Sequence, residues 1–404
     1  MNSILHLGFP QVTRLWGDYQ ARFLLAATFL TFLILPQALR AQGVYVQTNL
    51  VSDGFVPAQT IDANLENPWG LVQSSTSPFW VSDNGANVST LYAGKGAKLG
   101  LTVTIPTLST PSNGPTGIVF NGGTGFPSPA GSTTNSLFIF ANLNGTIDSW
   151  AGANGMTVQV GATVPNAVFT GLAINTSSVD IYAANFGPTG GIDEFSSNWS
   201  PVSLSGNAFK DPSLASGLEP YNIQDINGTL YVAYASIGSN GKLQLALGDG
   251  ALATFDESGN LLKTLVQGGN LDAPWGVAIA PADFGQFSND LLVGNRGNGV
   301  INAFDPTSGA FLGTLEDISG NDITNSGLWA LFFGTGGSGT SQDTLYITAG
   351  LNGYRDGVLA AIDPTPEPGS LILLGIGLLM LGTILRRRAT GVKLGLGRAS
   401  VNKS

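Results

Sequence analysis

The sequence predicts an all-β fold, a six-bladed β-propeller, from three observations. Composition is the first: of 404 residues 56 are Gly and only 10% are charged, and short runs rich in Val, Ile, Thr, Phe and Tyr are separated by turn-forming residues. Length is the second, because about 320 residues remain between two atypical ends, which suits one domain built from repeats. The third is a unit that recurs six times.

The repeated unit opens with an aromatic residue or Thr, usually before Gly, and continues through three strands. The opening residues are Trp69, Thr116, Thr170, Tyr221, Trp275 and Trp329. The distances between successive ones are 47, 54, 51, 54 and 54 positions. We expect second strands near 79–83, 137–142, 181–185, 230–234, 291–295 and 345–349. A period of about 50 residues with three or four strands per unit is typical of propeller blades and not of helical solenoids.

One strand has no unit of its own. Most units have a fourth strand, such as 100–105 or 261–266, but the sixth ends after its third strand, at Pro364. The spare strand is at the start of the domain, at residues 44–50. We expect it to become the outer strand of the last blade, which would close the ring and remove a long unpaired edge.

The first 41 residues have the composition of a secretory signal peptide. Arg14 and Arg22 precede the apolar run at 23–35, and small residues lead to Ala41, where we expect cleavage. An uncleaved N-terminal anchor is the alternative, since the leader before the apolar run is long. The remaining domain, residues 42–364, then has neither Cys nor His, because His6 is the sole His of the chain. This excludes disulfides, thiol nucleophiles, His-based triads and the usual zinc sites.

The C-terminal end, residues 365–388, reads as a membrane-sorting segment. Pro366, Glu367 and Pro368 precede an apolar segment at 369–385, and Arg386, Arg387 and Arg388 follow it. About 17 apolar residues are at the lower limit for a transmembrane helix, and the Arg cluster would hold the basic tail, 389–404, in the cytoplasm.

This order of Pro-Glu-Pro, apolar run and Arg cluster resembles the PEP-CTERM sorting signal, although 16 residues follow Arg388 where such signals usually stop within a few. The resemblance implies recognition and cleavage by an exosortase, a membrane transpeptidase, and display at the cell surface or release from it. A plain membrane anchor is the alternative.

Charge separates the two ends from the domain. Residues 1–41 and 386–404 together hold 9 basic residues and 1 acidic residue; taking these from 16 and 26 leaves 7 basic and 25 acidic residues between them, a net charge of −18. Such a domain repels nucleic acid and anionic lipid, since binding to phosphates needs Lys and Arg. Nucleic acid is therefore excluded as a partner.

Four stretches carry a second resemblance: 67–71, 79–85, 291–295 and 327–331. They are similar to NHL-type propellers and, more closely, to an uncharacterised family of exported propellers that often end in PEP-CTERM. The resemblance covers residues 44–364 and implies a fold without an established activity.

A polar residue ends the second strand of four units: Asp83, Asn142, Asn185 and Asn295. Equivalent positions of a propeller meet around its axis, so these oxygens are candidate ligands for Ca²⁺ or another divalent cation. The alternative is that they accept backbone N–H groups in the strand-to-strand turns.

The aromatic residues at the blade openings, Trp69, Tyr221, Trp275 and Trp329, are candidates for a carbohydrate-binding platform. Packing between neighbouring blades is the alternative. Two functions follow. The first is an exported surface or matrix protein, without enzymatic activity, that binds polysaccharide or surface partners. The second is a divalent-metal-dependent, lactonase-like hydrolase with an ion on the axis.

Overall fold

The computed structural model describes residues 44–106, 114–129, 134–188, 190–238, 240–365, 375–383 and 385–386. The chain divides into two compact units, one of which is Val44–Thr365 and carries the whole propeller. The predicted signal peptide, the Pro366-Glu367-Pro368 motif, Arg387 and Arg388 lie outside the described residues. Residues 375–383 and 385–386 are helical. Over the ranges given above, no helix has both the length and the apolar character needed to cross a membrane.

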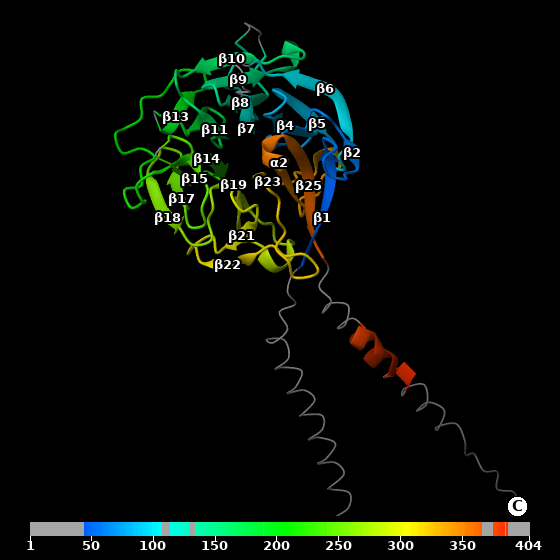
Figure 1. Ribbon diagram of the computed structural model, residues 1–404. Helices are drawn as coiled ribbons and strands as arrows, with labels where there is room; N and C mark the ends of the chain where they lie inside the picture. The colour runs from blue at the N-terminus through cyan, green and yellow to red at the C-terminus, as the bar shows by residue number, and fades with distance from the viewer. Residues whose placement is uncertain are drawn as a thin grey trace, which may run out of the picture. The chain divides into compact units, whose positions relative to one another are not determined.

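Six β-sheets surround a central axis, which confirms the predicted six-bladed propeller (Figure 1). Blade 1 contains β3 (Pro68–Val72), β4 (Phe79–Asp83), β5 (Val88–Tyr92) and β6 (Lys98–Thr104). Blade 2 contains β7 (Pro115–Phe120), β8 (Phe138–Asn142), β9 (Thr146–Trp150) and β10 (Gln159–Thr163). Blade 3 contains β11 (Phe169–Ile174), β12 (Asp180–Asn185) and β13 (Gly191–Ser196).

Blade 4 contains β14 (Leu218–Ile226), β15 (Thr229–Ile237), β17 (Gly250–Asp256) and β18 (Leu261–Gln267), with β16 (Leu243–Gln244) paired to β15. Blade 5 contains β19 (Pro274–Ile279), β20 (Leu291–Asn295), β21 (Ile301–Phe304) and β22 (Phe311–Thr314). Successive strands within these five blades pair antiparallel, as short hairpin connections require.

Blade 6 combines the two ends of the domain. Its strands β23 (Leu328–Phe333), β24 (Leu345–Gly350) and β25 (Asp356–Pro364) come from the sixth repeat. Next to β25 lies β1 (Tyr45–Ser52), which pairs with it antiparallel from Tyr45 opposite Pro364 to Ser52 opposite Val358. The short β2 (Thr60–Ile61) follows β1 in the same sheet. The N-terminal strand β1 thus pairs with the last strand of the sixth repeat.

The innermost strands contact one another in a closed circle, in the order β3, β7, β11, β14, β19 and β23. This contact explains the Gly of the repeat. A Cβ atom at Gly70 would lie 2.5 Å from the carbonyl oxygen of Thr116 in the next blade, and one at Gly276 would lie 2.5 Å from that of Trp329. A side chain at either position would therefore push two blades apart.

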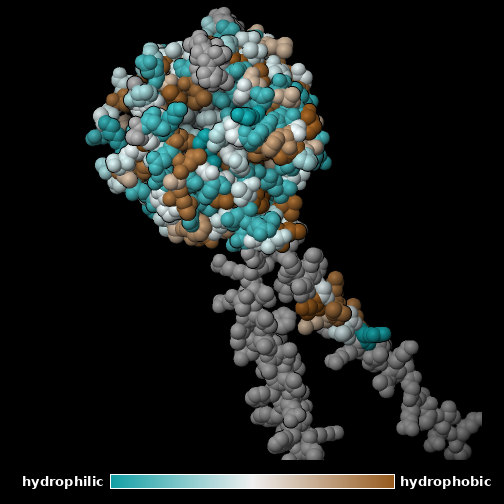
Figure 2. Space-filling model, in the orientation of Figure 1, coloured by the Kyte–Doolittle hydropathy of each residue, from teal (hydrophilic) through white to brown (hydrophobic). Residues whose placement is uncertain are grey.

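Apolar side chains fill the spaces between blades. Between blades 1 and 2, for example, Trp80 stacks on Phe138 with ring centroids 4.1 Å apart and contacts Trp150 at 4.7 Å. The outer surface in view is a mosaic of hydrophilic and hydrophobic residues (Figure 2). The core therefore lies between blades and around the axis.

Candidate functional site

The four aromatic residues predicted at the blade openings meet on the axis. Trp69 and Trp329 are stacked, with centroids 3.5 Å apart and planes 19° apart. Trp275 stands nearly perpendicular to both, at 6.2 Å and 5.9 Å. Tyr221 lies 6.2 Å from Trp329. The contacts Trp69–Trp275 and Tyr221–Trp329 join blades that are not neighbours, so they cross the axis. The other two contacts of Trp329 join neighbouring blades. We call these four residues the axial aromatic cluster.

The axial aromatic cluster is buried, with exposed fractions of 7% for Trp69, 3% for Tyr221, 5% for Trp275 and 0% for Trp329. Little ring surface is therefore left on which a sugar could stack. The rings contact each other both across the axis and between neighbouring blades.

Hydrogen bonds hold the axial aromatic cluster to the inner strands. Trp329 Nε1 donates to Asn67 Oδ1 at 3.0 Å, and Trp275 Nε1 donates to the carbonyl oxygen of Thr170 at 2.8 Å. Asn222 Nδ2 donates to the carbonyl oxygen of Trp275 at 2.7 Å. Each bond joins one blade to another, so the cluster is fixed by the ring itself and closes the axis.

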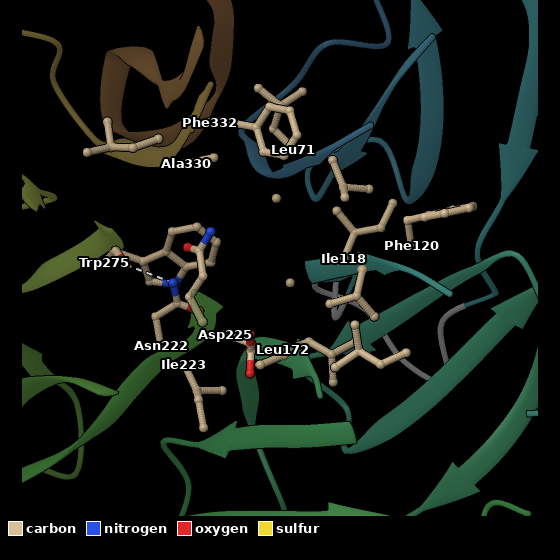
Figure 3. Close-up of a pocket in the computed structure, with 18 of the residues that line it drawn as sticks. Leu71, Ile118, Phe120, Leu172, Asn222, Ile223, Asp225, Trp275, Ala330 and Phe332 are labelled. Carbon is tan, nitrogen blue, oxygen red and sulfur yellow. Dashed lines mark hydrogen bonds between the residues drawn. The ribbon is translucent and has the colours of Figure 1, made fainter. Parts of the chain in front are cut away.

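Beyond the axial aromatic cluster the axis widens into a cavity of about 290 Å³. We call it the axial cavity. Its walls are formed by residues near the C-terminal ends of five inner strands, β3, β7, β11, β14 and β23. Trp275 is the residue of the axial aromatic cluster that also lines the cavity. Figure 3 shows Trp275 and Asn222 on one side of the space and Ile118, Phe120 and Leu172 on the other. Most of the wall is apolar, and the polar side chains that line it are Gln73, Asn222, Gln224 and Asp225.

The polar side chains of the axial cavity differ in what they already bind. Gln73 is engaged with the loop before blade 6's second strand, since its Nε2 donates to Gly337 and its Oε1 accepts from Thr335. Asp225 accepts a hydrogen bond from the backbone N–H of Gly228 through Oδ1, while Oδ2 is buried without a partner among the described residues. Burial, together with the neighbouring carboxylate of Glu257, raises the pKa of Asp225. Its second oxygen is therefore enclosed by the protein, near the Glu257 carboxylate.

The predicted metal ligands Asp83, Asn142, Asn185 and Asn295 are all buried at the ends of second strands. In blade 1, Asp83 Oδ2 accepts from the Thr90 N–H at 3.1 Å and from its hydroxyl at 2.7 Å. Asn142 Nδ2 donates to the hydroxyl oxygen of Thr146 at 3.0 Å. These bonds link each side chain to the next strand of its own blade.

The other two predicted ligands also bond near their own turns. Asn185 Oδ1 accepts from the backbone N–H groups of Val168 and Gly187, at 3.1 Å and 3.0 Å. Asn295 Oδ1 accepts from the backbone N–H of Asp272 at 3.0 Å. Across the part of the chain that the structure describes, no three His, Cys, Asp or Glu side chains come together in a way that could hold a metal ion.

Three candidate functional residues were not predicted from the sequence. Gln224 and Asp225 belong to β14, an inner strand that is more polar than its equivalents, and this difference was the available signal. Arg296 follows β20 and lies over the ring of Trp329, with its guanidinium carbon 5.0 Å from the centroid. Nothing in the repeat pattern singles out this residue.

Comparison with known proteins defines the class first. Residues 364–388 match the PEP-CTERM protein-sorting motif, which confirms the sorting signal inferred from the sequence. The chain is therefore an exported six-bladed β-propeller with a C-terminal motif for membrane-associated sorting by an exosortase.

Relatives of the whole propeller define the family. The chain is 30% identical over 325 residues to the uncharacterised protein R648 of Acanthamoeba polyphaga mimivirus, a match that covers 78% of each chain. It is 28% identical over 335 residues to the uncharacterised protein L690 of the same virus, covering 80% of this chain and 87% of the relative. The chain belongs to the family of these proteins.

A solved structure supports the fold alone. A protein of unknown function from Bacteroides thetaiotaomicron superposes with a TM-score of 0.52 and 10% identity, over 80% of this chain and 77% of that chain.

Proposed function

We propose that the protein is an exported binding protein of the cell surface or extracellular matrix, and that the axial cavity holds its ligand. The observation that carries this proposal is an apolar cavity on the axis, closed at one end by the axial aromatic cluster and provided with a few polar groups on one wall. Small-molecule sites in proteins have this combination of concave, mostly apolar walls and a small number of polar groups.

The end of an extracellular polysaccharide is the ligand that this site fits best. A cavity of about 290 Å³ has room for a group of the size of one sugar ring, and not for a chain passing through. Sugars present apolar C–H faces together with hydroxyl donors. The side chain of Gln224 can form a hydrogen bond with such a hydroxyl, and Leu172 and Ile118 offer the apolar contact.

The two ends of the chain provide the export route in this proposal. Residues 1–41 act as the signal peptide, and 369–385 hold the protein in the membrane until exosortase cleaves near Pro366-Glu367-Pro368. The propeller is complete at Thr365, so cleavage there leaves every blade intact. The mature protein then stays at the cell surface or enters the matrix.

Polysaccharide retention by the full-length chain tests the binding function. Gln224→Ala and Asp225→Ala each remove one polar group of the axial cavity, and we expect about tenfold weaker retention from each lost hydrogen bond. Gln159→Ala, on the outer strand β10, is the matched control and should bind as the native chain does. The proposal fails if no polysaccharide is retained, or if both cavity variants bind like the control.

A divalent-metal-dependent, lactonase-like hydrolase is the second candidate. One observation favours it: Asp83 Oδ1 and Asn142 Oδ1 are buried and lack a hydrogen-bond partner among the described residues. Oxygen atoms of this kind suit Ca²⁺. Elemental analysis of the purified protein and thermal melts with and without chelator decide it, since a structural or catalytic ion would be detected and its removal would lower the melting temperature.

A further inference from the structure

Arg296 covers the axial aromatic cluster at the mouth opposite the axial cavity. Its guanidinium carbon lies 4.4 Å from the ring centroid of Tyr354 and 5.0 Å from that of Trp329. The backbone N–H of Arg296 donates to the carbonyl oxygen of Ala273, just before β19 begins. Tyr354 ends α2 (Leu351–Tyr354), in the connection between β24 and β25. Both residues therefore lie where the inner strands start, whereas the axial cavity is lined by later positions of those strands.

Among the residues that the structure describes, the guanidinium of Arg296 has no anionic partner. No carboxylate of the described residues lies within 4.0 Å of its nitrogens, and Nε is buried without an acceptor. Asp272 interacts with it only through longer-range charge, which lowers the pKa of that carboxyl slightly against the larger effect of burial. A guanidinium presents five donors in a rigid fork, and a buried donor without an acceptor is costly. The Nε–H of Arg296 therefore lacks an acceptor among the described residues, and a bound anion could supply one.

The scarcity of Arg in the propeller strengthens this argument. Residues 42–365 contain 24 acidic residues but only two Arg, Arg296 and Arg355, and both lie next to Tyr354. Arg355 directly follows Tyr354 and is exposed. With so many carboxylates available, an Arg that pairs with none of them at the centre of the ring points to a ligand anion.

The backbone at this mouth is strained in two non-Gly residues. Tyr354 has a φ of 68° and Ala273 a φ of 48°, both in the left-handed region that such residues rarely adopt. Tyr354 thereby places its ring against Arg296, and Ala273 accepts the Arg296 N–H. Strained residues of this kind are concentrated at ligand sites, where the rest of the fold holds them.

We propose that this mouth is a second binding site, specific for an oxyanion on an extracellular ligand, such as the carboxylate of an acidic sugar or a phosphate or sulfate ester. Arg296 binds the oxyanion through its fork, and Trp329 and Tyr354 hold the guanidinium plane in place. The site does not depend on the axial cavity, because the axial aromatic cluster separates them. The net charge of −18 repels polyanions in general, so binding requires the local contact with Arg296.

Titration of the full-length chain in neutral detergent tests this site. The probes are glucuronate, inorganic phosphate and sulfate, with glucose as the uncharged control, and the readouts are calorimetry and tryptophan fluorescence. We expect at least one oxyanion to bind and glucose not to bind at this mouth, and the tightest of the three identifies the chemical source.

Variants decide whether Arg296 carries the binding. Arg296→Gln and Arg296→Lys should each weaken oxyanion binding by about tenfold or more, because Lys keeps the charge but loses the planar fork. Lys210→Gln removes an exposed cation elsewhere and is the control. Arg296→Lys decides the matter if Arg296→Gln fails to fold. Asp225→Ala should leave oxyanion binding unchanged, which separates this site from the axial cavity. The proposal is overturned if no oxyanion binds, or if the Arg296→Lys variant binds like the control.

Discussion

Deleting residues 43–52 should abolish the cooperative unfolding of the propeller, because these residues form the outer strand of blade 6. β1 pairs with β25 over seven residue positions, and it buries Tyr45, Leu50 and Val51. Tyr45 also reaches blade 5. Its hydroxyl donates to the carbonyl oxygen of Phe284 at 3.0 Å and accepts from the N–H of Phe287 at 3.3 Å. β1 therefore joins two blades as well as the two ends of the domain.

The magnitude follows from what β1 buries. Each of the three buried side chains contributes about 1.5–3 kcal/mol by leaving water, and each hydrogen bond of the strand ladder about 1 kcal/mol. The total is on the order of 10 kcal/mol, which is comparable to the whole unfolding free energy of many domains. A milder change, Tyr45→Phe, removes only the hydroxyl and leaves the Phe284 carbonyl and Phe287 N–H unpaired. It should cost about 2 kcal/mol.

Urea unfolding followed by tryptophan fluorescence measures both changes, since the propeller contains Trp residues in four blades. We expect one sharp transition for the native chain, an earlier but equally sharp one for Tyr45→Phe, and a broad, non-cooperative transition for the deletion. Thr48→Ser, on the same strand, is a control that should change little. A deletion variant that unfolds as sharply as the native chain would refute the reasoning that β1 closes the ring.

Two further predictions concern the contacts between blades. Gly276→Ala should destabilise the propeller by about 1–3 kcal/mol, because its Cβ would lie 2.5 Å from the Trp329 carbonyl oxygen. Gly100→Ala is the control: its Cβ would meet no atom within 4 Å, so the variant should be neutral in the same melt. Burial raises the pKa of Asp148 to about 7, so the folded state holds a proton there that the unfolded state has released; stability should therefore fall between about pH 4 and pH 7, by at most about 4 kcal/mol. Asp148→Asn should remove this pH dependence, which thermal melts of both proteins at pH 5 and pH 8 measure. The assignment is wrong if the variant loses as much stability between these two pH values as the native chain does.

The fold could be predicted from sequence because the repeat reveals each strand twice, through its own pattern and through its copies. The second strand of blade 5 was expected at 291–295 and is Leu291–Asn295, and that of blade 1 was expected at 79–83 and is Phe79–Asp83. The outer strands were harder to predict. They are half exposed, as in the Lys98–Thr104 strand, so their apolar pattern is weaker. Blade 3 has three strands in the residues described.

The candidate site was predicted less well, because the apolar pattern of a strand does not show which of its residues face the axis. The sequence identified the aromatic residues at the blade openings as a set. It predicted, however, that Asp83 and its equivalents would meet on the axis, whereas the aromatic residues do. Both sets are buried, so composition does not distinguish them. Arg296 and Tyr354 lie in connections that differ from blade to blade, and no periodic signal marks them.

The axial aromatic cluster has a consequence for the form of the ligand. Trp69 and Trp329 are in direct contact on the axis, and Trp275 is tied to blade 3 through Thr170, so a polymer cannot pass from one mouth to the other. If both proposed sites exist, each mouth would meet a ligand from outside, one beside Gln224 and the other at Arg296, whose guanidinium has no carboxylate partner among the described residues. A saccharide would enter the axial cavity by a chain end with its hydroxyls, whereas an oxyanion would be bound only at the Arg296 mouth. Because the two sites differ in charge, an exported propeller of this kind can connect two different surface components without their competing for one site.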